Sequence, residues 1–197
     1  MLFRSPATTP PDPPRPQPAK TTPVALDGPW QVTFQKNRGA PERISLDRLA
    51  PLNKHPDPGV RYFSGTATFR AGFELTAEAA ARPAVLDLGA VHGVAEIAIN
   101  GRPLANLWRP PYRLELDSGV LRAGGNELEI AVTGSWRNRM IGDERHPRDF
   151  ATIARGRAHF VNQWPDWYVE GRPRPVAERA SFSTSLFYDK DDPLSPS

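Results

Sequence analysis

Alternation of apolar and polar residues is the dominant pattern along this chain, and it predicts short β-strands. In residues 28–35, Trp30, Val32 and Phe34 alternate with polar neighbours, as expected for a strand with one buried face. A longer alternation covers residues 62–75. The same pattern recurs at 84–89, 94–99, 104–108, 112–116, 127–132 and 180–188.

Turn signals separate these stretches. Asn100-Gly101 lies between two of them, and this pair tolerates positive φ, so it predicts a tight hairpin. Residues 124–126 form a second Gly-Asn turn. Residues 76–81 are the one short helical candidate, and residues 36–59 are polar and proline-containing, so we expect a loop there.

The spacing of strands and turns predicts an all-β fold, a β-sandwich or jelly roll of roughly seven or eight strands. Long helices do not alternate with the strands, so the chain contains no (β/α) barrel. Residues 135–178 lose the alternation and are rich in arginine, tryptophan and proline, which predicts loops. We expect the folded domain at residues 24–190 and a polar tail at 191–197.

Proline is concentrated at the start of the chain, which has 23 prolines in all. Those before the first strand are Pro6, Pro10, Pro11, Pro13, Pro14, Pro16, Pro18 and Pro23. Proline has no N–H and a fixed φ, so residues 1–23 are predicted to be a disordered, extended linker; an SH3-type ligand is the alternative. Residues 1–15 lack the apolar core of a signal peptide, and no apolar run could span a bilayer.

Charge and composition exclude several kinds of chemistry. The net charge is +3, and the basic residues are interleaved with acidic ones, so neither a nucleic-acid nor a membrane partner is expected. The absence of cysteine excludes disulfides and thiol chemistry. The four histidines lack metal-ligand spacing, and no nucleophile elbow is present. Asp189, Asp191 and Asp192 could hold a structural calcium ion, but a solvated acidic tail is the simpler interpretation, and no cofactor is expected.

A series of stretches, in order, resembles the sugar-binding β-sandwich of glycoside hydrolase family 2. The resemblance is to the version at the C-terminal end of family 106 α-L-rhamnosidase-like enzymes, and it covers residues 24–145, and more loosely the rest. The carrying stretches are GPW at 28–30 with Val32 and Phe34, VRYFSGTA at 60–67, LDLGAV at 86–91, AEIAING at 95–101, LWRPPY at 107–112, GNELEI at 125–130 and WRNRMIGDE at 136–144.

This resemblance implies a galactose-binding-domain-like jelly roll that binds carbohydrate and is not catalytic. It also implies a parent enzyme, typically periplasmic or secreted, whose separate (β/α) barrel carries the catalytic carboxylates. The family version continues beyond the PLSPS sequence at 193–197 into a closing strand, so we expect this chain to be a fragment of a larger hydrolase. Two alternatives stay open, a glycosidase that hydrolyses O-glycosyl bonds and a purely structural interaction module.

Candidate sugar contacts are concentrated in residues 136–144, after a predicted strand end. Sugar recognition needs flat aromatic faces and paired hydrogen-bonding groups, and this stretch is dense in both. The candidate substrate-binding residues are Trp108, Arg109, Trp136, Arg137, Asn138, Arg139, Asp143 and Glu144. In the alternative interpretation, Trp136 caps the core while an Arg139–Asp143 ion pair orders the loop.

Two further features have competing interpretations. Asp143 and Glu144 could be an acid and a base, but adjacent residues rarely face a bond from opposite sides, so no catalytic residue is expected. Residues 162–168 hold Trp164, Trp167 and Tyr168, which could stack on a sugar ring. The favoured interpretation is burial, either as a satellite cluster over the sandwich or against a partner domain that this chain lacks. If a docking face is uncovered, Trp108, Trp136, Trp164 and Trp167 should be exposed.

Overall fold

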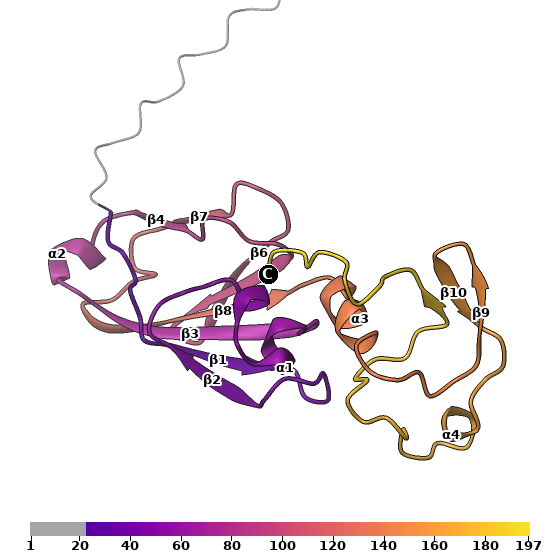
Figure 1. Ribbon diagram of the computed structural model, residues 1–197. Helices are drawn as coiled ribbons and strands as arrows, with labels where there is room; N and C mark the ends of the chain where they lie inside the picture. Colours follow the sequence, from indigo (N-terminus) through magenta and orange to yellow (C-terminus); the bar gives the residue numbers. More distant parts are fainter. Residues whose placement is uncertain (1–22) are drawn as a thin grey trace, which may run out of the picture.

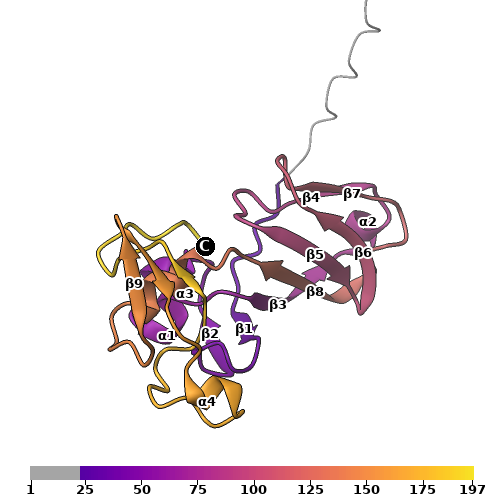
Figure 2. The same cartoon turned by 90° about the vertical axis from the view of Figure 1, so that its right-hand side faces the viewer.

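The computed structural model describes residues 23–197, which form a β-sandwich followed by a smaller C-terminal lobe (Figures 1 and 2). The stretch expected to be a disordered linker lies, except for Pro23, outside the described residues. Within the described part, no helix combines the length and the apolar character needed to cross a bilayer.

The larger layer of the sandwich is a six-stranded antiparallel sheet in the order β2-β1-β3-β8-β5-β6. Its strands are β1 (Trp30–Phe34), β2 (Arg43–Leu46), β3 (Thr66–Leu75), β5 (Val94–Ile99), β6 (Arg102–Leu107) and β8 (Gly124–Thr133). The alternation seen in the sequence places apolar residues on one face of this sheet. Val32, Phe69, Ile130 and Ile97 form one cross-strand row on that face.

The second layer over this apolar face is the antiparallel pair β4 (Ala84–Asp87) and β7 (Arg113–Leu116), which are far apart in the sequence. Trp30, Ile97 and Leu128 from the sheet pack against Leu116 and Tyr112 in the main core cluster. The all-β sandwich expected from the sequence is thereby confirmed.

A second cluster extends the core along the same sheet. The short helices η1 (Leu52–Lys54) and α1 (Pro58–Arg61) cover Val32 and Phe34, with Val60 fully buried. The expectation of a loop over residues 36–59 was therefore wrong in part, because β2 pairs with β1 there and η1 follows it. Residue propensities did not predict β2 or η1, because these two elements are stabilised by contact with β1 rather than by their own residues.

Two local expectations are confirmed. The helix α2 (Ala77–Ala80) begins after Thr76, whose hydroxyl accepts a hydrogen bond from the Ala79 N–H at 3.2 Å. Asn100 and Gly101 connect β5 to β6 with φ of 53° and 75°. The Asn100 amide also accepts from the Glu127 N–H at 3.0 Å, which ties the turn to the neighbouring strand β8.

The C-terminal lobe follows β8 and lies beside the end of the sheet (Figure 2). It contains α3 (Arg137–Asp143), β9 (Thr152–Arg155), β10 (Ala158–Val161), α4 (Asp166–Val169) and β11 (Ser185–Leu186). The strands form a small sheet in the order β11-β10-β9. The expectation of loops across residues 135–178 was therefore wrong in part, since α3, β9, β10 and α4 interrupt the loops. Only two residues of the strand expected at 180–188 pair as a strand.

Candidate functional site

The candidate sugar-binding residues gather at one end of the large sheet. Trp108 and Arg109 directly follow β6, whose last residue Leu107 pairs with Ala95. The strand β8 ends at the same edge, where Thr133 pairs with Val94, and α3 begins a few residues later. The ends of β6 and β8 lie two strand spacings, about 10 Å, apart. The helix α3 itself packs beside Ser64 and Arg38, near β1 and β3 and away from β6. The stretch expected as a loop at 136–144 is a helix.

Three of the candidates are buried inside the contact between α3 and its surroundings. Asn138, Arg139 and Asp143 are each exposed by 4% or less. The ion pair expected between Arg139 and Asp143 is present, with 2.9 Å between Nε and Oδ1. The Arg139 N–H donates to the Ser64 hydroxyl at 3.1 Å, which fixes α3 to the sandwich.

The Asp143 carboxylate joins α3 to a distant segment of the lobe. It accepts hydrogen bonds from the Ala180 N–H at 3.0 Å and the Ser181 N–H at 2.9 Å, and a further one from the Ser181 hydroxyl. The Asp143 carboxylate therefore has a structural role, because it links α3 to residues 180–181.

Glu144 is held in the same way by two arginines. Its Oε1 accepts from Arg179 at 2.6 Å, and its Oε2 accepts from Arg148 at 2.6 Å. Arg179 is only 2% exposed and also donates to the carbonyls of Asp143 and His146. The carboxylates of Asp143 and Glu144 are thus both bound by partners within the chain.

The other candidates keep solvent-exposed faces. Trp108 is 67% exposed, and the Arg109 guanidinium lies 5.2 Å from its ring centroid. Trp136 is 43% exposed under the Arg38 guanidinium at 4.4 Å, which contradicts the alternative interpretation in which it caps the core. Arg137 lies over Tyr188 and donates to the Pro193 carbonyl at 3.0 Å. Trp108, Arg109 and Trp136 are exposed, and Arg137 is partly exposed.

A second buried ion pair stabilises the lobe. Arg174 binds the Asp149 carboxylate with both Nε, at 2.6 Å, and Nη2, at 2.9 Å, and also donates to the Arg179 carbonyl. Burial alone would raise the pKa of Asp149. The hydrogen bonds and positive charge of Arg174 outweigh that effect and hold the pKa below its ordinary value of 3.8.

The acidic tail considered for calcium is engaged in hydrogen bonds within the chain. Asp192 accepts from the Asp189 N–H at 2.9 Å and from Arg157 at 2.9 Å, and these contacts lower its pKa. Within residues 23–197, no group of three or more His, Cys, Asp or Glu side chains is placed to hold a metal ion.

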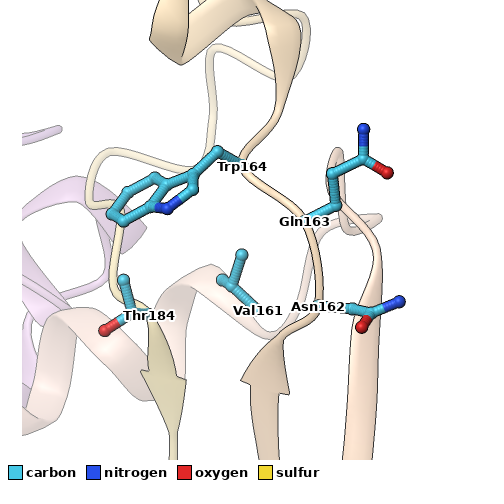
Figure 3. A pocket seen from close by; sticks show the side chains of 5 residues that line it. All are labelled: Val161, Asn162, Gln163, Trp164 and Thr184. Carbon is cyan, nitrogen blue, oxygen red and sulfur yellow. The ribbon is translucent and has the colours of Figure 1, made fainter.

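Within the described residues the aromatic stretch 162–168 is not a buried satellite cluster. Trp164 is 51% exposed and Tyr168 is 50% exposed, and their rings stack with centroids 5.3 Å apart and an interplanar angle of 22°. Trp167 is half-buried, and its indole N–H donates to the Asp149 carbonyl at 3.2 Å. Cavities of about 170 and 370 Å³ adjoin Trp164, and Figure 3 shows the smaller one between the indole and Val161.

Sequence comparison relates this chain to a short region of long enzymes. No protein-family model matches it. It is 34% identical over 174 residues to the "Putative beta-glucuronidase" of Formosa agariphila, a match that covers 87% of this chain and 14% of that protein.

Structural comparison gives a similar result. The rhamnosidase from Novosphingobium sp. PP1Y superposes with a TM-score of 0.69 and 36% identity, over 93% of this chain and 15% of that enzyme. A β-glucuronidase from Ruminococcus gnavus matches 55% of this chain at 20% identity and a TM-score of 0.46, which is too weak to support a conclusion. The expected relationship to glycoside hydrolases is confirmed, and in these relatives the matched region is a small part of a much longer chain.

Proposed function

We propose that this chain is a non-catalytic accessory domain of a glycoside hydrolase. It would be a galactose-binding-domain-like jelly roll of the type at the C-terminal end of family 106 α-L-rhamnosidase-like enzymes. The observation that carries the proposal is the asymmetry of the matches, which cover 87–93% of this chain and 14–15% of the relatives. Catalysis would then come from a partner (β/α) barrel, and carbohydrate would be the ligand.

The state of the adjacent carboxylates supports a non-catalytic role. Glycosidases need an acid and a second carboxylate on opposite sides of the scissile bond, about 5–10 Å apart. Asp143 is 2% exposed and bound to Arg139 and two backbone N–H groups, while Glu144 is bound to two arginines. We infer that their role is to hold α3 and the end of the sandwich in a fixed position.

The exposed candidates support a contact face at the end of the sheet. Trp108 and Trp136 present aromatic surface, and Arg109 and Arg137 supply charged donors beside it. A face with this composition suits either a sugar or the surface of a catalytic domain. The orientation of Trp136 and Arg137 depends on α3, which the buried contacts of Arg139 and Asp143 fix against the sandwich.

Activity measurements on the full chain test the non-catalytic role. We expect no turnover of aryl α-L-rhamnosides or aryl β-D-glucuronides. Turnover that is lost in a folded Glu144→Gln variant and retained in Trp108→Ala would contradict the proposal, because it would assign the chemistry to this chain.

A purely structural module is the second candidate function. It is favoured by the guanidinium groups of Arg38 and Arg109, which already lie over the rings of Trp136 and Trp108. Titration with rhamnose- and galactose-containing glycans separates the two functions. A saturable change in tryptophan fluorescence supports carbohydrate binding, whereas no change at millimolar sugar supports the structural role.

A further inference from the structure

We infer that the C-terminal lobe carries a sugar-stacking site of its own, centred on Trp164 and Tyr168, that takes a neutral pyranose ring. The inference rests on the proposed function for the choice of carbohydrate as ligand. It differs in location, because it places the ligand on the lobe rather than at the end of the large sheet.

The first support is an ordered aromatic platform open to solvent. Trp164 and Tyr168 stack face to face while about half of each side chain remains exposed. Phe182 lies behind Tyr168 with centroids 4.7 Å apart, and Trp167 contacts Phe182 edge-on at 5.4 Å. These contacts fix the ring planes before a ligand arrives, which lowers the entropic cost of binding. The apolar C–H face of a pyranose suits such a platform.

The second support is a set of unused hydrogen-bonding side chains around the platform. Gln163 and Asp166 line the larger cavity, of about 370 Å³, and Asn162 and Thr184 line the smaller one. Among residues 23–197, none of these four side chains has a hydrogen-bond partner. Asn162, Gln163 and Thr184 can each donate and accept, and Asp166 can accept, and sugar hydroxyls need both kinds of group.

Figure 3 shows how these groups are distributed around Trp164. The indole lies across the space above Val161 and Thr184, while the amides of Asn162 and Gln163 point to the other side of the chain. Gln163 lines both cavities. On the indole's side of this cavity the polar side chain is therefore Thr184, which lies beneath the ring, while the two amides face away from it.

The charges around the larger cavity favour a neutral sugar over a uronic acid. Each arginine near it already has an acidic partner: Arg174 binds Asp149, and Arg172 lies 2.5 Å from Glu170. Asp166 has no cationic partner among the described residues. A ligand carboxylate would therefore meet a net negative charge and no free guanidinium.

Indole N–H signals in ¹⁵N NMR spectra of the full chain test this site directly. The chain has five tryptophans, and the Trp164 signal is the one absent from the Trp164→Phe variant. We expect that signal to shift on titration with methyl α-L-rhamnopyranoside or methyl β-D-galactopyranoside. The buried Trp30, whose indole donates to the Leu26 carbonyl, serves as the internal reference that does not shift.

Variants supply the quantitative test. Trp164→Ala should raise the dissociation constant for the neutral sugar by about 10- to 30-fold, as for a central aromatic contact. Trp108→Ala, which removes an equally exposed tryptophan elsewhere, should change it by less than about twofold. If Trp164→Ala lowers the unfolding midpoint of the lobe, then Thr184→Val decides the matter, because the exposed Thr184 hydroxyl lines the same cavity and is not part of the aromatic packing. It should raise the same dissociation constant several-fold, and an unchanged constant would overturn the site.

The possible results separate this inference from the proposed function. Shifts of the Trp108 or Trp136 signal without a Trp164 shift would overturn the site on the lobe and leave the accessory, carbohydrate-binding role standing. If no indole signal shifts with either sugar, both the site on the lobe and the carbohydrate-binding role are overturned. A stronger response to D-glucuronic acid, or to a peptide of residues 6–18 in place of sugar, would overturn the assignment of a neutral pyranose, since aromatic grooves also bind proline-rich segments.

Discussion

The side-chain amide of Asn138 pairs with the backbone of Ser195 in both directions. Its Nδ2 donates to the Ser195 carbonyl at 2.9 Å, and its Oδ1 accepts from the Ser195 N–H at 2.8 Å. Asn53 donates to the same carbonyl at 3.1 Å, and the Leu52 N–H donates to the Ser197 carbonyl at 2.7 Å. The last residues are therefore held between η1 and α3.

Replacing Asn138 should release this tail. Asn138→Ala leaves the Ser195 N–H without its partner next to a buried position, which costs about 1–3 kcal/mol of unfolding free energy. Urea unfolding followed by tryptophan fluorescence measures the loss. Asn106→Ala is the matched control, because Asn106 is exposed on the edge strand β6, and it should change stability by less than about 0.5 kcal/mol. Equal effects of the two substitutions would contradict a role for the Asn138–Ser195 pairing.

The ion pair of Arg139 and Asp143 should be worth far more than an exposed pair of the same spacing. Asp143→Asn leaves the Arg139 guanidinium buried without its counter-charge, and the expected loss is about 3–5 kcal/mol. Glu78→Gln is the control, because Glu78 and Arg82 have the same i,i+4 spacing but are 76% and 70% exposed. It should cost less than about 0.5 kcal/mol. Denaturant midpoints of both variants check this difference, and similar midpoints would refute it.

The β5–β6 hairpin makes a prediction about backbone conformation alone. Gly101 has φ of 75°, and a Cβ there would meet nothing within 4 Å, so Gly101→Ala should cost about 1 kcal/mol from the strained φ. Gly72 lies in β3 without a positive φ, and its Cβ would make only ordinary contact with the Asn126 carbonyl. Gly72→Ala should therefore be neutral or stabilising. Thermal unfolding of both variants tests this, and equal losses would mean that φ is not the cause.

Strands and turns could be predicted from the sequence because their signals are local. Trp30, Val32 and Phe34 alternate with polar neighbours, which predicts one apolar face. In the structure Val32 pairs with Phe69 of β3, so apolar residues of the two strands lie on that same face. Asn100-Gly101 specifies its turn by two residues that tolerate positive φ. Each of these features is determined by residues a few positions apart, so the alternation and the turn residues were sufficient.

The helix α3 and its network could not be predicted in the same way. Arg137–Asp143 is short and rich in arginine, with no apolar periodicity that indicates a helix. Its stabilising partners are Ser64 and Ser181, far away in the sequence. Long-range contacts of this kind decide which polar residues are buried. The candidate sugar contacts at Asn138, Arg139 and Asp143 were chosen for their chemistry, and their burial is visible only in the fold.

The Asp149–Arg174 pair should make stability depend on pH in the acid range. The pKa of Asp149 is below its ordinary value of 3.8 in the folded state, so the unfolded state takes up the proton first as the pH falls. The stabilisation is fully present above 3.8 and is lost as the pH falls through the folded-state pKa. Asp149→Asn should be less stable than the natural chain at neutral pH, and the gap should narrow in acid. Urea midpoints measured between about pH 6 and pH 2.5 check this.

Asp87 provides the control for this pH dependence. Its pKa is also lowered, first by the hydrogen bond from the Gly89 N–H and then by Arg113, but its side chain is solvent-exposed. Salt screens the attraction between Asp87 and Arg113. The difference in stability between Asp87→Asn and the natural chain should therefore be smaller than for Asp149→Asn, and it should shrink when salt is added. The Asp149 gap should resist salt, because the Asp149 side chain is only 3% exposed. Two results would show that Asp149 and Arg174 are not a buried, ionised contact. One is a stability difference for Asp149→Asn that stays constant across the acid range. The other is a difference that disappears with salt, as the one for Asp87→Asn should.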